Sequence, residues 1–193
     1  MMKWIPVCIM VLALSACGGA GQPSYYQLPQ ADAVLSSQLH KDATGRPAVW
    51  IERLTLPDYL SAGGIVYQTS KVNYVIASRH LWASPLDQQL KQALINNLSA
   101  QLPGRVVSAT ALGDRPDVLS VNITAFQGRY DGQVVISGDW ILQQGNIIRR
   151  QGFSLSLPLR DDGYQPLVKT LAAGWQQVSA EIARQLSSAA GNR

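Results

Sequence analysis

The chain is poor in the side chains on which most enzymes and metal proteins depend. It has two cysteines and two histidines among 193 residues. Neither His40 nor His80 lies in a recognisable nucleophile elbow or catalytic triad, and a zinc site needs more thiolate or imidazole ligands than these. His80 is interpreted as a solvated turn or helix-end residue. We therefore expect no metal and no cofactor, and a serine hydrolase is the least favoured function.

Other signs of catalysis are also missing. Asp161 and Asp162 are adjacent residues in a turn before a predicted helix, which is typical of capping groups rather than of an acid/base pair. The sequence has no glycine-rich loop with the spacing that cradles a phosphate. These absences indicate a tethered binding or assembly protein, not an enzyme.

Charge is scarce and evenly spread. Charged residues make up 15% of the sequence, and the formal net charge is +4. The Arg149-Arg150 pair alone is weak evidence for nucleic-acid binding, because basic runs that follow phosphates are longer. We therefore expect no nucleic-acid partner.

The only long apolar run lies at the N-terminus, where residues 4–16 carry no charge and follow Lys3. Thirteen residues are too few to cross a bilayer as a helix, but they suit the apolar part of a signal peptide. The run closes on Leu14-Ser15-Ala16-Cys17. This resembles the lipobox of bacterial lipoproteins, in which the cysteine receives a diacylglycerol and the signal is cut before it. The alternative is an ordinary secretory signal with a chance cysteine.

The lipobox divides the chain into three parts: a signal peptide over 1–16, a lipidated tether over 17–23 that begins at Cys17, and a single periplasmic domain over 24–193. Gly18 stands where an inner-membrane retention signal usually has an aspartate, which favours anchoring in the outer membrane. Removal of residues 1–16 leaves 177 residues, enough for one sizeable core, and takes away Lys3, so the net charge becomes +3. With Cys8 removed and Cys17 acylated, no free thiol remains.

Alternating apolar residues predict several strands in the mature chain. The expected strands cover 25–28, 48–56, 65–68, 72–76 and 106–108, and three more at 119–125, 133–143 and 147–159 form an antiparallel meander. The strand at 72–76 is expected to turn at Ser78-Arg79-His80. Asp131-Gly132, between the first two meander strands, suits a type I′ hairpin turn. Residues 30–46 are interpreted as a surface excursion.

Two amphipathic helices are predicted. The first has Ser84 as its N-cap and Pro103-Gly104 as its end, and the second covers 164–188. Each carries one apolar stripe, which we expect to pack on the core. The stripes contain Leu86, Leu90, Leu94, Leu98 and Leu102 in the first helix, and Leu167, Leu171, Trp175, Val178, Ile182 and Leu186 in the second.

Together these elements predict an α+β domain: an antiparallel or mixed sheet with a C-terminal β-meander and two amphipathic helices packed on one face. Between two of its strands, Leu56, Pro57, Tyr59 and Leu60 lie in a turn-rich segment that carries apolar side chains. They are the candidate partner-binding residues, because a short exposed loop cannot bury all of them. The alternative is that Tyr59 and Leu60 plug the sheet edge.

Several segments, in the same order, resemble the ABC-type transport auxiliary lipoprotein family. Besides the lipobox they are Tyr25–Pro29, Leu56–Leu60, Val66–Ser70, Leu81–Leu90, Leu98–Gly104 and Gly128–Gly132. The match covers nearly all of the mature chain and is weakest over 30–46. The resemblance implies an outer-membrane lipoprotein that works with a PqiB-like MCE protein, thought to form a lipid conduit across the periplasm, and indirectly with a PqiA-like inner-membrane protein. The family has no assigned catalytic residues.

Two functions remain open. In the first, the domain is a non-catalytic platform that docks the conduit at the outer membrane and supports membrane integrity, as a homo-oligomeric ring, because its partners form rings and closed symmetry needs matching interfaces. In the second, it is a monomeric lipid carrier. A ring predicts interface patches on outer sheet faces, whereas a carrier predicts an enclosed apolar cavity of several hundred Å³.

Overall fold

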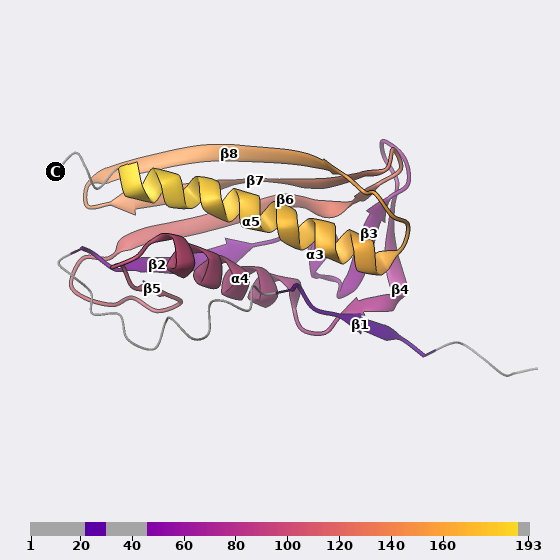
Figure 1. Ribbon diagram of the computed structural model, residues 1–193, viewed down its shortest axis with the longest axis horizontal. Coiled ribbons are helices and arrows are strands. Elements are labelled where there is room, and N and C mark those ends of the chain that lie inside the picture. The colour runs from indigo at the N-terminus through magenta and orange to yellow at the C-terminus, as the bar shows by residue number, and fades with distance from the viewer. Residues whose placement is uncertain (1–21, 30–45, 189–193) are drawn as a thin grey trace, which may run out of the picture.

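The computed structural model describes residues 22–29 and 46–188, and its α+β architecture confirms the predicted fold class. An eight-stranded mixed sheet carries its two long helices on one face (Figure 1). The strands are β1 (Ser24–Tyr26), β2 (Val49–Thr55), β3 (Gly64–Gln68), β4 (Tyr74–Trp82), β5 (Val107–Ser108), β6 (Asp117–Arg129), β7 (Gln133–Gln144) and β8 (Ile147–Pro158). The helices are α3 (Asp58–Ser61), α4 (Leu86–Gln101) and α5 (Tyr164–Ser188). The predicted signal peptide, Cys17, His40 and nearly all of the 30–46 excursion lie outside the described residues.

The long strand β6 is the centre of the sheet. One edge of β6 pairs with β7, which in turn pairs with β8, and both pairings are antiparallel. The other edge is shared, because β2 pairs in parallel with the first half of β6 and β3 with its last residues. Beyond β3 the sheet continues through β4 to β1, and beyond β2 it continues to β5. The predicted meander is therefore confirmed, and it joins two groups of shorter strands.

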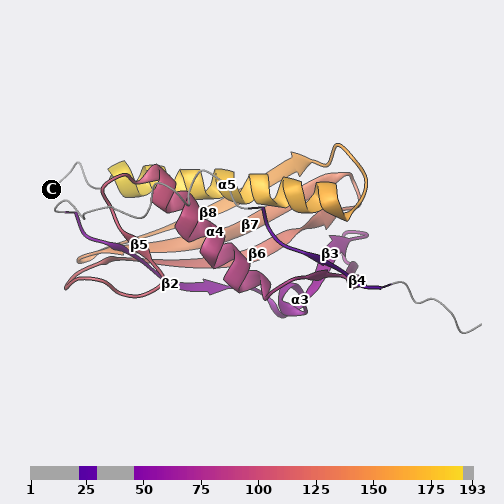
Figure 2. The same cartoon turned by 60° about the horizontal axis from the view of Figure 1, so that its bottom comes forward.

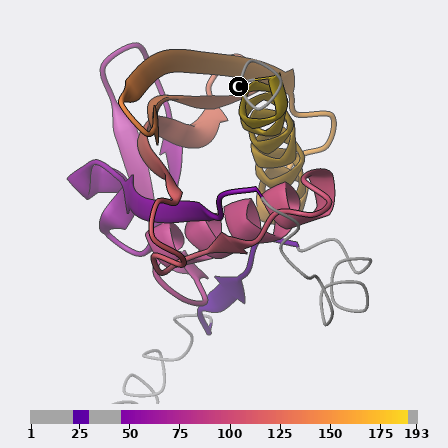
Figure 3. The ribbon, with the colours of Figure 1, turned by 90° about the vertical axis from the view of Figure 1, so that its left-hand side faces the viewer.

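The two helices close the open side of the curled sheet, as the end-on view shows (Figure 3). Every residue of the two predicted apolar stripes is buried, so the stripes are confirmed as core-facing. The helices meet where the indole Nε1 of Trp175 donates a hydrogen bond to the backbone oxygen of Leu90, at 3.1 Å. The largest side chains of this layer are fully buried: Trp140, Trp175 and Phe126.

The turn predicted at Ser78–His80 is wrong, because these residues belong to strand β4. The strand runs on to Trp82, because β3 and β1 offer backbone partners on its two sides and polar side chains can point to solvent. The start of α4 is also shifted from the prediction. Pro85, not Ser84, is the N-cap residue, and no side chain caps the helix. The backbone oxygen of Ser84 instead accepts a hydrogen bond from Nε2 of Gln89.

Two irregularities change which residues face the core. The register of β2 against β6 shifts between Ile51 and Arg53. Leu54 is therefore buried like Ile51, although simple alternation would place the two side chains on opposite faces of the strand. In β6 a shift between Ile123 and Ala125 likewise turns Phe126 inward. A β-bulge adds one residue to one strand and thereby reverses the alternation beyond it.

The turn between β6 and β7 is not the predicted two-residue type I′ turn. It contains the three residues 130–132, and of these only Gly132 has a positive φ, of 73°. A type I′ turn needs positive φ at both central residues. The loop instead closes by a hydrogen bond from the Gly132 N–H to the Arg129 oxygen, and Arg129 forms an ion pair with Asp131.

A buried ion pair joins several segments of the chain at one end of the domain. The Arg105 guanidinium contacts Asp117 at 2.6 Å, and both side chains are almost fully buried. Arg105 also donates to the backbone oxygens of Pro47 and Leu186, and Asp117 accepts from Nε2 of Gln144. The network thereby ties together the segment before β2, the start of β6, the end of β7 and the end of α5.

Candidate protein-interaction surface

The segment predicted to bind a partner folds as the single-turn helix α3. Pro57 precedes it with extended backbone, and the Pro57 oxygen accepts hydrogen bonds from the N–H groups of Leu60 and Ser61. Leu60 is only 1% exposed and belongs to the core. Its predicted exposure is therefore wrong, because one helical turn directs this side chain inward. Leu56, Pro57 and Tyr59 are half-buried.

Tyr59 lies against the neighbouring strands. Its hydroxyl donates a hydrogen bond to the Thr124 oxygen at 2.8 Å, and its ring contacts that of Tyr74, with 5.2 Å between centroids. Burial and, to a smaller extent, the neighbouring Tyr74 together raise the pKa of Tyr59 to about 12. The phenol is therefore a protonated donor at physiological pH. The half-exposed ring of Tyr59 and the ring of Tyr74 form one aromatic patch.

Strand β4 extends this patch with a run of exposed apolar side chains. Tyr74, Val75 and Ile76 are 45%, 52% and 41% exposed, although successive residues of a strand point to opposite faces. Among the described residues, the edge of β4 that faces away from β3 pairs only with β1, at His80–Trp82. We call Tyr59, Tyr74, Val75 and Ile76 the β4 edge surface. An exposed strand edge flanked by apolar side chains is a typical site for protein association.

The other end of β4 holds an aromatic cluster in place of the solvated turn predicted for His80. The Tyr26 hydroxyl lies 2.9 Å from Nδ1 of His80, and the imidazole stacks on Tyr164 with 3.7 Å between ring centroids. These contacts join β1, β4 and the first residue of α5. His80 thus has a structural position between two aromatic rings.

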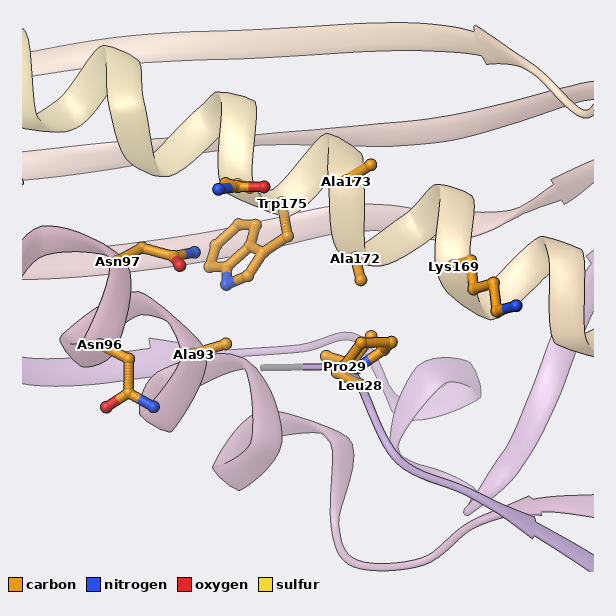
Figure 4. Close-up of a pocket in the computed structure, with 10 residues that line it drawn as sticks. Leu28, Pro29, Ala93, Asn96, Asn97, Lys169, Ala172, Ala173 and Trp175 are labelled. Atoms are coloured by element: carbon orange, nitrogen blue, oxygen red, sulfur yellow. The ribbon is translucent and has the colours of Figure 1, made fainter. Parts of the chain in front are cut away.

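A groove between α4 and α5 was not foreseen from the sequence (Figure 4). Its volume is about 270 Å³, and its lining mixes apolar with polar groups, including Ala93, Asn97, Lys169, Ala172 and Trp175. This volume lies below the range of about 300–1,000 Å³ that is usual for small-molecule pockets. The space between helices and sheet is filled by the core side chains. This packing offers little room for an acyl chain.

Within residues 22–29 and 46–188, no three His, Cys, Asp or Glu side chains are grouped so that they could hold a metal ion. None of the helices described for this chain is long and apolar enough to cross a membrane.

Comparison with known proteins agrees with the resemblance seen in the sequence. The ABC-type transport auxiliary lipoprotein component family matches residues 26–183. The intermembrane transport lipoproteins PqiC of Escherichia coli K12 and of Shigella flexneri are each 48% identical over 188 residues, which cover 96% of this chain and 98% of theirs.

Solved structures show the same fold. A crystal structure of an uncharacterized protein, 48% identical, superimposes with a TM-score of 0.77 and covers 86% of this chain and 99% of its own. A Xanthomonas campestris protein shares the fold at 14% identity, with a TM-score of 0.62 and the same two coverages. The chain therefore belongs to the ABC-type transport auxiliary lipoprotein family.

Proposed function

We propose that this protein is an outer-membrane lipoprotein, without catalytic activity, that docks a PqiB-like MCE conduit at the outer membrane. In this proposal Cys17 carries the lipid, residues 17–23 are the tether, and residues 24–193 form the periplasmic domain. Identity of 48% to relatives named intermembrane transport lipoproteins supports a part in transport between membranes. A PqiA-like inner-membrane protein is then an indirect partner.

The observation that carries the proposed assembly into a docking platform is the β4 edge surface. A monomer in solution gains nothing by exposing three consecutive apolar residues beside an open strand edge. Covering them with protein removes apolar area from water at roughly 25 cal/mol per Å². Because closed rings form when one surface meets a different surface of the next copy, we propose that this surface joins neighbouring copies in a ring under the conduit.

A monomeric lipid carrier is less well supported. It needs an enclosed apolar cavity, whereas the layer between the sheet and the helices is filled by side chains such as Trp140, Trp175 and Phe126. The groove between α4 and α5 is small and partly polar.

Replacement of the lipid-bearing residue tests the anchoring. In the Cys17→Ser variant the thioether to diacylglycerol cannot form, so we expect the protein to leave the outer-membrane fraction and to lack the acyl mass. Membrane fractionation and mass spectrometry measure both. Acylation that persists in Cys17→Ser contradicts the targeting part of the proposal.

Truncation of Tyr59 tests the assembly. Tyr59→Ala removes the ring that extends the β4 edge surface, and a tyrosine at the centre of an interface contributes about 1–3 kcal/mol to association. We expect weaker self-assembly or weaker binding of the MCE protein. Chromatography with light scattering measures the first, and a pull-down measures the second.

The matched control is Tyr59→Phe, which keeps the ring beside Tyr74 and loses only the hydrogen bonds of the hydroxyl to Thr124 and Gln127. This control should assemble normally. If Tyr59→Ala assembles like the wild type but melts much earlier, Tyr59 only plugs the sheet edge. The partner surface then lies elsewhere, for example on the polar face of the β6–β8 meander.

A further inference from the structure

The chain enters the described domain beside strand β4. Strand β1 runs parallel to β4, with Ser24 opposite His80, so the residues before Ser24 are directed toward the first half of β4. Gln22 lines a surface hollow of about 490 Å³ together with Val75, Ile76 and Arg79. The β3–β4 hairpin and the start of β1 lie at the same end of the long axis, away from the last turn of α5 (Figures 1 and 2).

The length of the tether limits how far this end can lie from the membrane. Four residues, 18–21, lie between Cys17 and Gln22, so the chain makes five steps of at most about 3.3–3.6 Å each, or about 18 Å in total. If Cys17 is lipidated, as proposed above, Gln22 and the end of the domain that carries it are held close to the bilayer. The β7–β8 hairpin lies at the other end of the molecule.

The tip of the β3–β4 hairpin presents an apolar side chain to solvent on a well-bonded turn. Val72 is 81% exposed, the highest value among the exposed large apolar residues of the described chain. The Ser70 hydroxyl accepts hydrogen bonds from the N–H groups of Val72 and Asn73, and the Thr69 N–H donates to the Asn73 oxygen at 2.9 Å. The backbone of the tip is thus satisfied internally, while Val72 projects outward beside the exposed Lys71.

Other side chains near the tether suit the same environment. Tyr25 is 64% exposed on β1, and Arg79 borders the hollow that Gln22 lines. Proteins are enriched at the level of the lipid headgroups in tyrosines, whose hydroxyl stays solvated, and in lysines and arginines, whose apolar stems contact the lipid. The acidic Asp161 and Asp162 precede α5 at this end, and they favour contact at headgroup depth over insertion into the hydrocarbon.

We propose that the β3–β4 hairpin tip, with Val72 at its apex and Lys71 beside it, is a second membrane contact that rests on the lipid surface in which Cys17 is anchored. A lipid surface fits this tip because the tether brings the two within reach, and a small apolar apex beside a cation matches the boundary between acyl chains and headgroups. The contact fixes the orientation of the domain, so the β7–β8 end faces the periplasm. It rests on the proposed lipid anchoring.

A single-cysteine probe tests this contact in the full lipidated protein. With Cys17 acylated, Val72→Cys introduces the only free thiol, which takes a polarity-sensitive fluorophore. Ile148→Cys is the matched control, because Ile148 is 67% exposed on the β7–β8 hairpin at the other end. Both proteins are reconstituted into phosphatidylethanolamine–phosphatidylglycerol vesicles, with or without brominated lipids that quench on contact.

We expect the label at 72 to shift its emission to the blue and to be quenched severalfold more strongly by brominated lipid than the label at 148. Equal quenching at the two positions, or stronger quenching at 148, overturns the membrane contact while the protein still floats with the vesicles. If mass spectrometry finds no acyl chains on Cys17 and the protein does not float, the anchoring and the contact that rests on it both fail. Flotation and quenching thus separate the two failures.

Discussion

Replacement of Arg105 by methionine is expected to lower the free energy of unfolding by about 3–5 kcal/mol. Arg105 and Asp117 are 3% and 4% exposed, and the guanidinium also bonds the Pro47 oxygen. Methionine fills much of the same space but leaves the Asp117 carboxylate buried without its cation. A buried charge that loses its partner costs several kcal/mol.

Chemical denaturation, followed by circular dichroism, measures this loss. The control is Arg150→Met, because Arg150 also pairs with an aspartate, Asp139, but is 70% exposed. An exposed ion pair contributes roughly 0–1 kcal/mol. If Arg105→Met is no more destabilised than Arg150→Met, the buried ion pair does not stabilise the fold more than the exposed one. The double variant Arg105→Met, Asp117→Leu should regain part of the stability, because it removes both charges.

Much of the fold could be predicted because the periodicity of apolar residues reflects the face that each element buries. The second helix begins and ends where its stripe and flanking residues predict, at Tyr164 and Ser188. The meander strands alternate apolar and polar side chains over long stretches, so the sequence predicts these strands as well. These features depend on residues that are close in the chain, so a single sequence is enough to predict them.

What could not be predicted depends on pairing between distant segments. The extension of β4 through Ser78 and His80 needs β1 and β3 as backbone partners, and the bulge at Ile123 needs β7 opposite it. The sequence offers no local signal for either. The buried Arg105–Asp117 pair was missed because two charged residues in loop-like sequence are usually solvated.

The residues of the proposed interaction surface could be predicted only in part, for a similar reason. The sequence pointed to Tyr59, but Leu60 turned out to be buried and Tyr74 to be the neighbour of Tyr59. An apolar run such as Tyr74-Val75-Ile76 usually indicates a strand buried on both faces. Here both faces are partly exposed, because β4 stands near the margin of the sheet and α5 covers other strands. The exposure of that run, and not its composition, is the observation that supports the proposed interface.

Trp175 lies at the contact between α4 and α5, and Trp175→Ala is expected to lower the free energy of unfolding by about 3–5 kcal/mol. Trp175 is 1% exposed, its indole donates to the Leu90 oxygen, and its ring meets Phe153 edge to face at 6.3 Å.

Alanine at position 175 removes the indole hydrogen bond to the Leu90 oxygen and leaves a cavity between the helices, which the surrounding helices can fill only in part. Trp175→Phe is the matched control, since it keeps an aromatic ring and loses mainly the hydrogen bond, at about 0.5–1.5 kcal/mol. Thermal and denaturant melts of the three proteins should therefore rank the wild type first, Trp175→Phe second and Trp175→Ala last. A Trp175→Ala protein that melts like the wild type but no longer assembles would show that the groove beside this tryptophan receives a partner, since a residue needed only for the core cannot be removed without loss of stability.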